Sequence, residues 1–193
     1  GLSEGEALTD TFSYVVSDTY NTPQTADLII TIEGTDDGVV LNGLDAQGAE
    51  EHVDEANLAD GSNPSAPALA QDGSFNFDAP DGIDTVSIGG QEFTVAQLQA
   101  LAGNNVTVSS DYGDLKLTGY TGDEFGGSIS YEYTLTGNVD NDSQEDANDA
   151  GFTDSFDVVV TDDDGSQAFG SLDVAIADDV PTAYADSNDV TEG

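Results

Sequence analysis

One stretch of this sequence occurs twice without a gap, and this repeat restricts the fold more than any single motif does. Leu8–Asp18 (LTDTFSYVVSD) aligns without a gap with Phe152–Asp162 (FTDSFDVVVTD) at an offset of 144 positions. Six residues recur unchanged in the second stretch: Thr9, Asp10, Phe12, Val15, Val16 and Asp18. The same offset relates two further alternating runs: Leu28, Ile30 and Ile32, and Leu172, Val174 and Ile176. An ungapped match through two strand-like runs and the turn between them indicates a tandem repeat.

A second pair of similar segments sets the expected limits of the repeating unit. His52–Gly61 (HVDEANLADG) and Asp189–Gly193 (DVTEG) share a valine, one intervening residue and a glutamate. We therefore expect a slice of a longer array with four parts. Residues 1–41 are the last strands of a preceding repeat, 42–52 a junction, 53–181 a complete repeat, and 182–193 a junction and the start of the next repeat.

The local pattern within the complete unit is that of β-strands. Apolar residues alternate with polar ones at Ile129, Tyr131, Tyr133 and Leu135, which is the period of a strand with one buried face. The segment FTVAQLQALAG is different, because Val95, Leu98 and Leu101 recur at helical spacing. Many short strands with one short helix predict an all-β, Ig-like Greek-key sandwich.

The charge of the chain excludes several classes of partner. Forty acidic residues accompany a single basic side chain, Lys116, and one histidine, His52, for a formal net charge of −39. Binding to nucleic acid or to an anionic membrane requires basic side chains, so we expect neither partner. No apolar run reaches the roughly 18 residues of a membrane span, and no cysteine is present to form disulfides. Two explanations of the charge remain open: a solvated, salt-adapted surface, or bound multivalent cations.

Calcium binds six to eight oxygen ligands, which carboxylates on loops can supply. Three groups of acidic residues are candidates: the turn TDDDG at the end of the second repeat copy, the long acidic loop, and the paired aspartates at the two junctions. We expect Asp36 and Asp37 to meet Glu55, and Asp178 and Asp179 to meet Glu192. No segment matches an EF-hand loop. The candidate ligands are Asp36, Asp37, Glu55, Asp140, Asp142, Asp162, Asp164, Asp178 and Asp179.

Two long segments carry a resemblance to known families. The stretch FTDSFDVVVTDDDGSQAFGSLDVAIADDVPTA and the region from EANLADG to EFTVAQLQAL resemble the Ig-like repeat of giant RTX adhesins that bacteria export by type I secretion. The segment GEALTDTFSYVVSDTYNTPQTADLIITIEGTDD is similar to the end of a VCBS-type, cadherin-like repeat. The first turn departs from the family, because SDTYNTPQ stands where the later copy has TDDDGSQ. Calcium at that first turn is therefore in doubt.

The resemblance implies a calcium-binding module on the surface of a Gram-negative cell, involved in adhesion and biofilm formation. We expect a monomeric, calcium-stiffened extender or junction domain whose partners are neighbouring repeats. The alternative is a ligand-binding module for a peptide or glycan, with Gly122–Gly127 and the acidic loop as its site and Tyr112, Tyr120 and Phe125 as aromatic platforms. We do not expect an enzyme, since one lysine, one histidine and no cysteine leave few nucleophile and base pairs.

Overall fold

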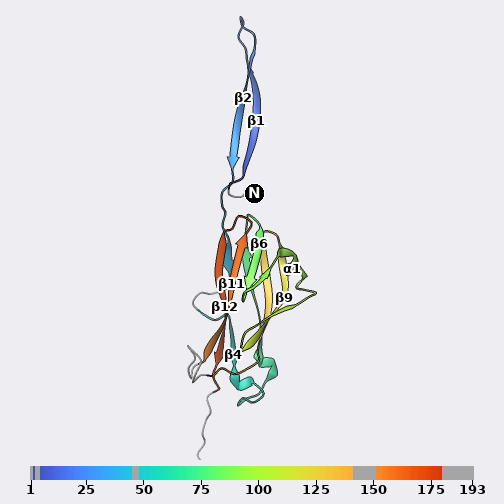
Figure 1. The fold of residues 1–193 in the computed structure, drawn as a ribbon, viewed down its shortest axis with the longest axis vertical. Coiled ribbons are helices and arrows are strands. Elements are labelled where there is room, and N and C mark those ends of the chain that lie inside the picture. The colour runs from blue at the N-terminus through green and yellow to red at the C-terminus, as the bar shows by residue number, and fades with distance from the viewer. Residues whose placement is uncertain (1, 3–4, 45–47, 141–150, 180–193) are drawn as a thin grey trace, which may run out of the picture.

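The computed structural model describes residues 2, 5–44, 48–140 and 151–179. Within these ranges, an extended β-hairpin projects from one end of a two-layer β-sandwich (Figure 1). The hairpin consists of β1 (Ala7–Val16) and β2 (Gln24–Glu33), and a short linker joins it to the sandwich. No helix in the described ranges is long and apolar enough to cross a bilayer.

Each layer of the sandwich is a five-stranded sheet. The first sheet has, in spatial order, β3 (Val40–Asn42), β5 (Ala70–Asp78), β10 (Gly126–Leu135), β9 (Gly113–Asp123) and β8 (Val106–Ser109). The second has β4 (Glu51–Asp54), β12 (Gln167–Ala177), β11 (Phe152–Asp162), β6 (Ile83–Ile88) and β7 (Gln91–Phe93). Two 3₁₀ helices, η1 (Glu55–Asn57) and η2 (Ala66–Leu69), and one α-helix, α1 (Val95–Ala100), complete the described elements.

The strand order is that of an immunoglobulin-like Greek key. The first four strands of the first sheet take the A, B, E and D positions, while β6, β11 and β12 take C, F and G in the second. The chain crosses between the sheets after β3, β4, β5, β7 and β10. The predicted all-β, Ig-like sandwich with one short helix is therefore confirmed. Strand pairing in the sandwich already includes Val40–Asn42 and Glu51–Asp54, whereas the repeat limit at residue 53 stays a prediction.

The core lies between the two sheets and follows the alternation seen in the sequence. All four alternating residues of β10, from Ile129 to Leu135, are buried. So are alternate residues of β11 from Asp154 to Asp162 and of β12 from Leu172 to Ile176. The predicted helix is present as α1, and Leu98 and Leu101 are fully buried. Thr94 and Gln97 form a capping box at its start, which satisfies backbone N–H groups that the first turn leaves open.

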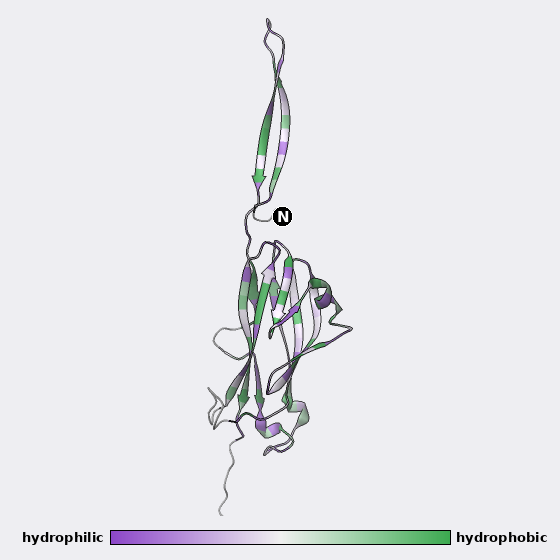
Figure 2. Cartoon of the chain, viewed as in Figure 1, coloured by the Kyte–Doolittle hydropathy of each residue, from purple (hydrophilic) through white to green (hydrophobic). Residues whose placement is uncertain are grey.

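The hairpin repeats the pairing of two sandwich strands residue for residue. In β1 and β2, Leu8 pairs with Ile32 and Phe12 with Leu28; in β11 and β12, Phe152 pairs with Ile176 and Phe156 with Leu172. Every pair from Leu8 with Ile32 to Val16 with Gln24 has a counterpart 144 residues later. The hairpin is thus a structural copy of β11–β12, but every one of its residues is exposed. Figure 2 shows its apolar stretches without a covering layer.

Candidate cation site at the hairpin end of the sandwich

Four aspartates converge where the hairpin linker meets the sandwich. Asp36 belongs to the linker after β2, and Asp81 to the turn between β5 and β6. Asp162 is the last residue of β11, and Asp164 belongs to the turn between β11 and β12. One carboxylate oxygen from each lies within 4.8 Å of the others. Strand pairing explains the convergence, because β6 lies beside β11 and Ile83 is the partner of Asp162. The turn before β6 therefore reaches the turn after β11.

Asp162 is the buried centre of this cluster. Its side chain is only 1% exposed, and Oδ1 accepts a 2.7 Å hydrogen bond from the backbone N–H of Ser166. No described residue donates a hydrogen bond to Oδ2. Burial, and then the neighbouring carboxylate of Asp164, raise the pKa of Asp162. A buried charged oxygen without a donor is costly, so this atom marks a place where a cation would stabilise the fold.

The equivalent aspartate of the hairpin is satisfied differently. Asp18 stands 144 positions before Asp162, and its Oδ1 accepts the backbone N–H groups of Tyr20 and Asn21 at 2.8 and 2.6 Å. The side-chain amide of Asn21 donates to Oδ2 at 2.7 Å. These local bonds, above all that from Tyr20, lower the pKa of Asp18. The two turns thus hold homologous carboxylates, but only Asp162 is left with a buried oxygen that lacks a donor.

Hydrogen bonds also connect the linker to the sandwich at this site. Ser166 Oγ donates to Asp36 Oδ2 at 2.8 Å, and the backbone N–H of Asp37 donates to Asp81 Oδ2 at 3.0 Å. The backbone N–H of Gly38 donates to Asp36 Oδ1 at 2.7 Å. These bonds orient the carboxylates of Asp36 and Asp81, two of the four in the cluster.

The donor set suits a hard divalent cation. Calcium takes carboxylate oxygens singly or in pairs and completes its shell with carbonyls and water, and four aspartates provide eight carboxylate oxygens. Without a cation, two carboxylates at about 4 Å repel each other by about 4 kcal/mol near a protein surface. The cluster therefore draws on two parts of the chain. Asp36 belongs to the linker outside the sandwich sheets, and the other three aspartates lie at the edge of the sandwich.

Three of the four aspartates in this cluster are among the candidate ligands named from the sequence. Asp36, Asp162 and Asp164 were candidates, whereas Asp81 in the segment APDG was missed, because its turn has no distinctive acidic spacing. Asp37 was expected as a ligand, but here its backbone N–H binds Asp81 and its side chain is not among the four. Only the pairing of β6 with β11 could have pointed to Asp81.

The expected pairing of Glu55 with Asp36 and Asp37 is wrong. Glu55 is buried, and its carboxylate accepts hydrogen bonds from the backbone N–H groups of Val139 and Asp179. Burial, and to a smaller extent the nearby Asp178, raise its pKa. The reason is the parallel pairing of β4 with β12, which places the residue after β4 beside the C-terminal end of β12. The hairpin end lies at the other end of that eleven-residue strand, about 35 Å away.

The remaining candidate ligands lie at the end of the sandwich opposite the β1–β2 hairpin, or outside the described residues. Asp179 accepts hydrogen bonds from Ser62 through both oxygens, at 2.6 Å from the hydroxyl and 2.7 Å from the backbone N–H. The charge of Asp140 contributes to a raised pKa at Tyr112, after burial and the charges of Asp111 and Asp154. Asp142 and Glu192 lie outside the described residues. Among described residues, only the cluster at the hairpin end brings three or more carboxylates together.

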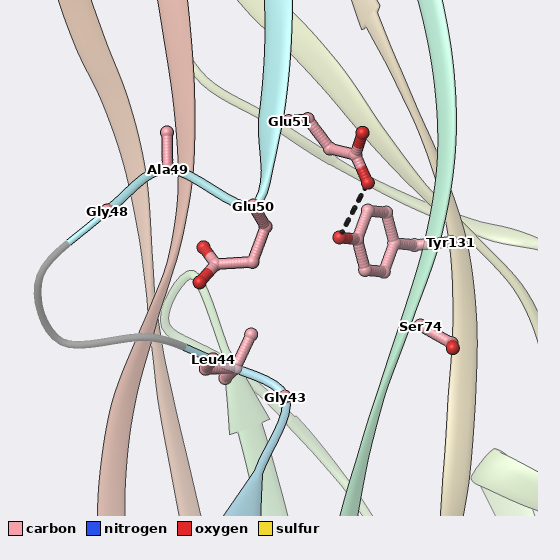
Figure 3. A pocket seen from close by; sticks show the side chains of 8 residues that line it. All are labelled: Gly43, Leu44, Gly48, Ala49, Glu50, Glu51, Ser74 and Tyr131. Atoms are coloured by element: carbon pink, nitrogen blue, oxygen red, sulfur yellow. Dashed lines mark hydrogen bonds between the residues drawn. The ribbon is translucent and has the colours of Figure 1, made fainter.

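A separate pocket of about 540 Å³ opens beside β4 (Figure 3). Glu51 and Tyr131 meet in its wall, where the tyrosine hydroxyl donates to Glu51 Oε1 at 3.2 Å. Burial is the main cause of the raised pKa of both groups. Glu50 also lines the pocket, and its Oε2 accepts the backbone N–H of Asp173 at 2.6 Å. The described lining residues supply carboxylate acceptors and the hydroxyls of Ser74 and Tyr131, and none of them is basic.

Two of the three proposed aromatic platforms are packed against other rings. Tyr120 stacks on Phe77 with ring centroids 6.1 Å apart, and its hydroxyl donates to the carbonyls of Asp123 and Gly126. Tyr112 meets Phe152 edge to face at 4.9 Å. Phe125, at the tip of the β9–β10 hairpin, is 47% exposed. The tip of the β9–β10 hairpin therefore offers one exposed aromatic ring, that of Phe125, and not a surface of three rings.

Comparison with known proteins shows a distant likeness to solved structures. No family model matches the chain, and no curated protein matches it. Among solved structures, the mouse clustered protocadherin PcdhgC3, domains EC1–3, is similar at 12% sequence identity and a TM-score of 0.31. That match covers 91% of this chain and 44% of the protocadherin chain, so this chain spans less than half of it. The assignment of the fold rests on the strand topology described above.

Proposed function

We propose that this chain is a calcium-binding extracellular module of a bacterial surface adhesin. The observation that carries the proposal is the four-aspartate cluster around the buried oxygen of Asp162, which receives no hydrogen bond from any described residue. A divalent cation there neutralises the repulsion and supplies Asp162 Oδ2 with a partner. The same cation links Asp36 of the linker to the sandwich edge.

In this proposal, calcium converts the linker into a stiff connection. With one ligand from the linker and three from the sandwich, the bound ion removes the rotational freedom of the segment between β2 and β3. A site with a dissociation constant of about 0.1 mM, in about 10 mM calcium, adds about 2.7 kcal/mol to the folded state. The module then acts as an extender or junction domain of an RTX adhesin that type I secretion exports to a Gram-negative cell surface, where it supports biofilm formation.

We also propose which partners the module has, and that it does not catalyse a reaction. The module is a monomer that contacts neighbouring repeats of its own chain, and it binds neither nucleic acid nor membrane and is not an enzyme. The alternative within the same adhesin is a module that binds a peptide or glycan. Phe125 and the pocket beside Glu51 are the features that favour it. Calcium-dependent binding to a glycan or peptide array would replace the extender assignment.

The test is a calcium titration followed by thermal unfolding and small-angle scattering, with magnesium as the control ion. We expect calcium, but not equimolar magnesium, to raise the melting temperature by several degrees and to narrow the distribution of shapes. Asp162→Asn and Asp81→Asn should each abolish most of this response. The matched control is Asp157→Asn on the exposed face of the same strand β11, which should leave it intact. Equal responses to calcium, magnesium and sodium chloride would refute the site.

A further inference from the structure

We propose that the inward face and both edges of the β1–β2 hairpin form a docking surface for a half-sandwich built like β3–β10 of this chain. The inference rests on the repeat and not on calcium. The starting observation is the shared register, in which every hairpin pair from Leu8 with Ile32 to Val16 with Gln24 matches a β11–β12 pair 144 residues later. Two strands with the same pairing and the same pattern of side chains present the same surface to whatever packs on them.

The apolar side chains identify the face that must be covered. Phe156, Leu172 and Val174 of the sandwich are at most 3% exposed, because the opposite sheet covers them. Their counterparts Phe12, Leu28 and Ile30 are 51%, 53% and 44% exposed. A two-stranded ribbon is at best marginally stable in water, and a contiguous apolar face of this kind marks an interaction site. The hairpin therefore requires a covering layer.

A buried carboxylate specifies the chemistry of that layer. Asp154, on the inward face of β11, accepts hydrogen bonds from Ser110 Oγ at 2.6 Å and from Tyr133 Oη at 2.8 Å. Its counterpart on the hairpin is Asp10, with Ile30 as cross-strand partner just as Val174 is that of Asp154. Covering Asp10 without donors would leave a buried charge unsatisfied. The covering sheet must therefore supply hydroxyl groups at this point, as the first sheet of the sandwich does.

The two edges of the hairpin identify the occupant further. In the sandwich, the outer edge of β11 pairs antiparallel with β6 over Val158–Asp162, and that of β12 pairs parallel with β4 over Val174–Ala177. The corresponding hairpin edges, residues 14–18 and 30–33, have no strand beside them among the described residues. One occupant can satisfy the face and both edges only if it brings a covering sheet and two flanking strands.

A second copy of the hairpin fits less well. Stacking two hairpins would cover the apolar face but leave the outer edges of both without partners. Each chain also carries a net charge of −39, which opposes self-association. The occupant that the observations favour is thus the remaining strands of the hairpin's own repeat, and a self-associated dimer is an outcome that the experiment must detect.

The test supplies those strands from this chain itself. A chimera places a copy of residues 40–150 directly before residue 7 of the chain, so that Leu8 follows the copied segment as Phe152 follows the original. We expect a second folded unit, and hydrogen exchange in β1 and β2 should slow by about 100-fold or more, because amides in packed strands exchange only through opening. In the original 193-residue chain, these amides should exchange rapidly at all protein concentrations.

Two neighbouring isoleucines give a matched pair of variants. Ile30→Asp places a charge on the inward face and should abolish the protection of β1 and β2 in the chimera. Ile29→Asp places the same charge on the outward face, where the equivalent sandwich residue is already Asp173, and should preserve the protection. Neither variant should change the exchange of the sandwich in the original chain.

A second chimera controls for the possibility that the new junction between the copied segment and the rest of the chain prevents folding. It carries residues 151–177 in place of residues 7–33 and so reconstitutes the sandwich from its own strands. If this control folds while the hairpin chimera leaves β1 and β2 unprotected, the proposal is overturned. A concentration-dependent dimer of the original chain that protects β1 and β2, and that Ile30→Asp dissolves, would overturn it as well and assign the face to a second copy.

Discussion

The ring of Tyr133 on β10 occupies the space that a Cβ at Gly113 on β9 would take. The missing side chain at Gly113 leaves room for this ring, whose hydroxyl donates to Oδ2 of Asp154 at 2.8 Å. Since β10 and β11 belong to different sheets, the bond connects the two layers through the core. Gly113, Tyr133 and Asp154 thus form one packing unit in which each member fixes the next.

Gly113→Ala should destabilise the sandwich by about 2 kcal/mol or more, because the added methyl group displaces the Tyr133 ring and its buried hydrogen bond. The control is Gly119→Ala on the same strand, where a Cβ meets nothing within 4 Å; it should change stability by less than about 0.5 kcal/mol. Urea unfolding followed by tyrosine fluorescence measures both. Equal effects of the two substitutions would show that the ring does not depend on this glycine.

Tyr133→Phe removes the hydroxyl and leaves Asp154 with Ser110 as its remaining side-chain donor. The free energy of unfolding should fall by about 1–3 kcal/mol, the cost of a buried charged acceptor that loses a donor. Tyr14→Phe in the exposed hairpin is the control and should have no measurable effect on unfolding of the sandwich. An unchanged urea midpoint for Tyr133→Phe would mean that water replaces the hydroxyl.

The effect of the Asp162 carboxylate on stability near neutral pH should change sign when calcium is added. Without calcium, burial and Asp164 raise the folded-state pKa of Asp162, so its contribution is present at low pH and is lost as pH rises through that pKa. Asp162→Asn should therefore gain stability relative to the natural chain between about pH 4 and pH 7 in EDTA. In calcium the order should reverse, since the ion binds the charged carboxylate.

The measurement for Asp162 is the difference in melting temperature between the natural chain and Asp162→Asn at each pH, with and without calcium. Taking the difference cancels the general repulsion among the other carboxylates, which both proteins share. A difference that has the same sign in EDTA and in calcium would show that calcium does not contact Asp162.

The ion pair between Lys116 and Glu132 should contribute little. The atoms Nζ and Oε1 are 3.5 Å apart, and the side chains are 41% and 37% exposed, so solvent screens the pair. A double-mutant cycle with Lys116→Gln and Glu132→Gln should give a coupling of no more than about 1 kcal/mol. The coupling is measured by urea unfolding at low and at high salt. A larger coupling that persists at high salt would contradict this expectation.

Local patterns in the sequence were sufficient for the strands, the helix and part of the site. Alternation placed Ile129 and its successors on the inward face, because strand period and burial are linked within a few residues. Asp162 and Asp164 were recognisable because both belong to one acidic turn. Such features depend only on neighbours along the chain.

Features set by strand pairing could not be read in the same way. Asp81 joins the cluster because β6 pairs with β11, and Glu55 lies away from it because β4 runs parallel to β12. Neither strand pairing can be predicted from the spacing of the acidic residues along the sequence. Conversely, the fixed offset of the repeat carried information about register, since the two hairpins share every described pair from Leu8 to Val16.

The position of β12 also determines how the sandwich responds to a stretching force. The linker enters at the end that contains Asp162, and the described chain leaves β12 at the opposite end through Asp178. A pull between these points runs along the strands, while the hydrogen bonds between strands lie across them. The bonds of β3 to β5 and of β12 to β4 and β11 are then sheared together instead of being opened one at a time. Tension applied through the two ends of the sandwich therefore loads these hydrogen bonds in shear, the direction in which a small sandwich resists unfolding most strongly.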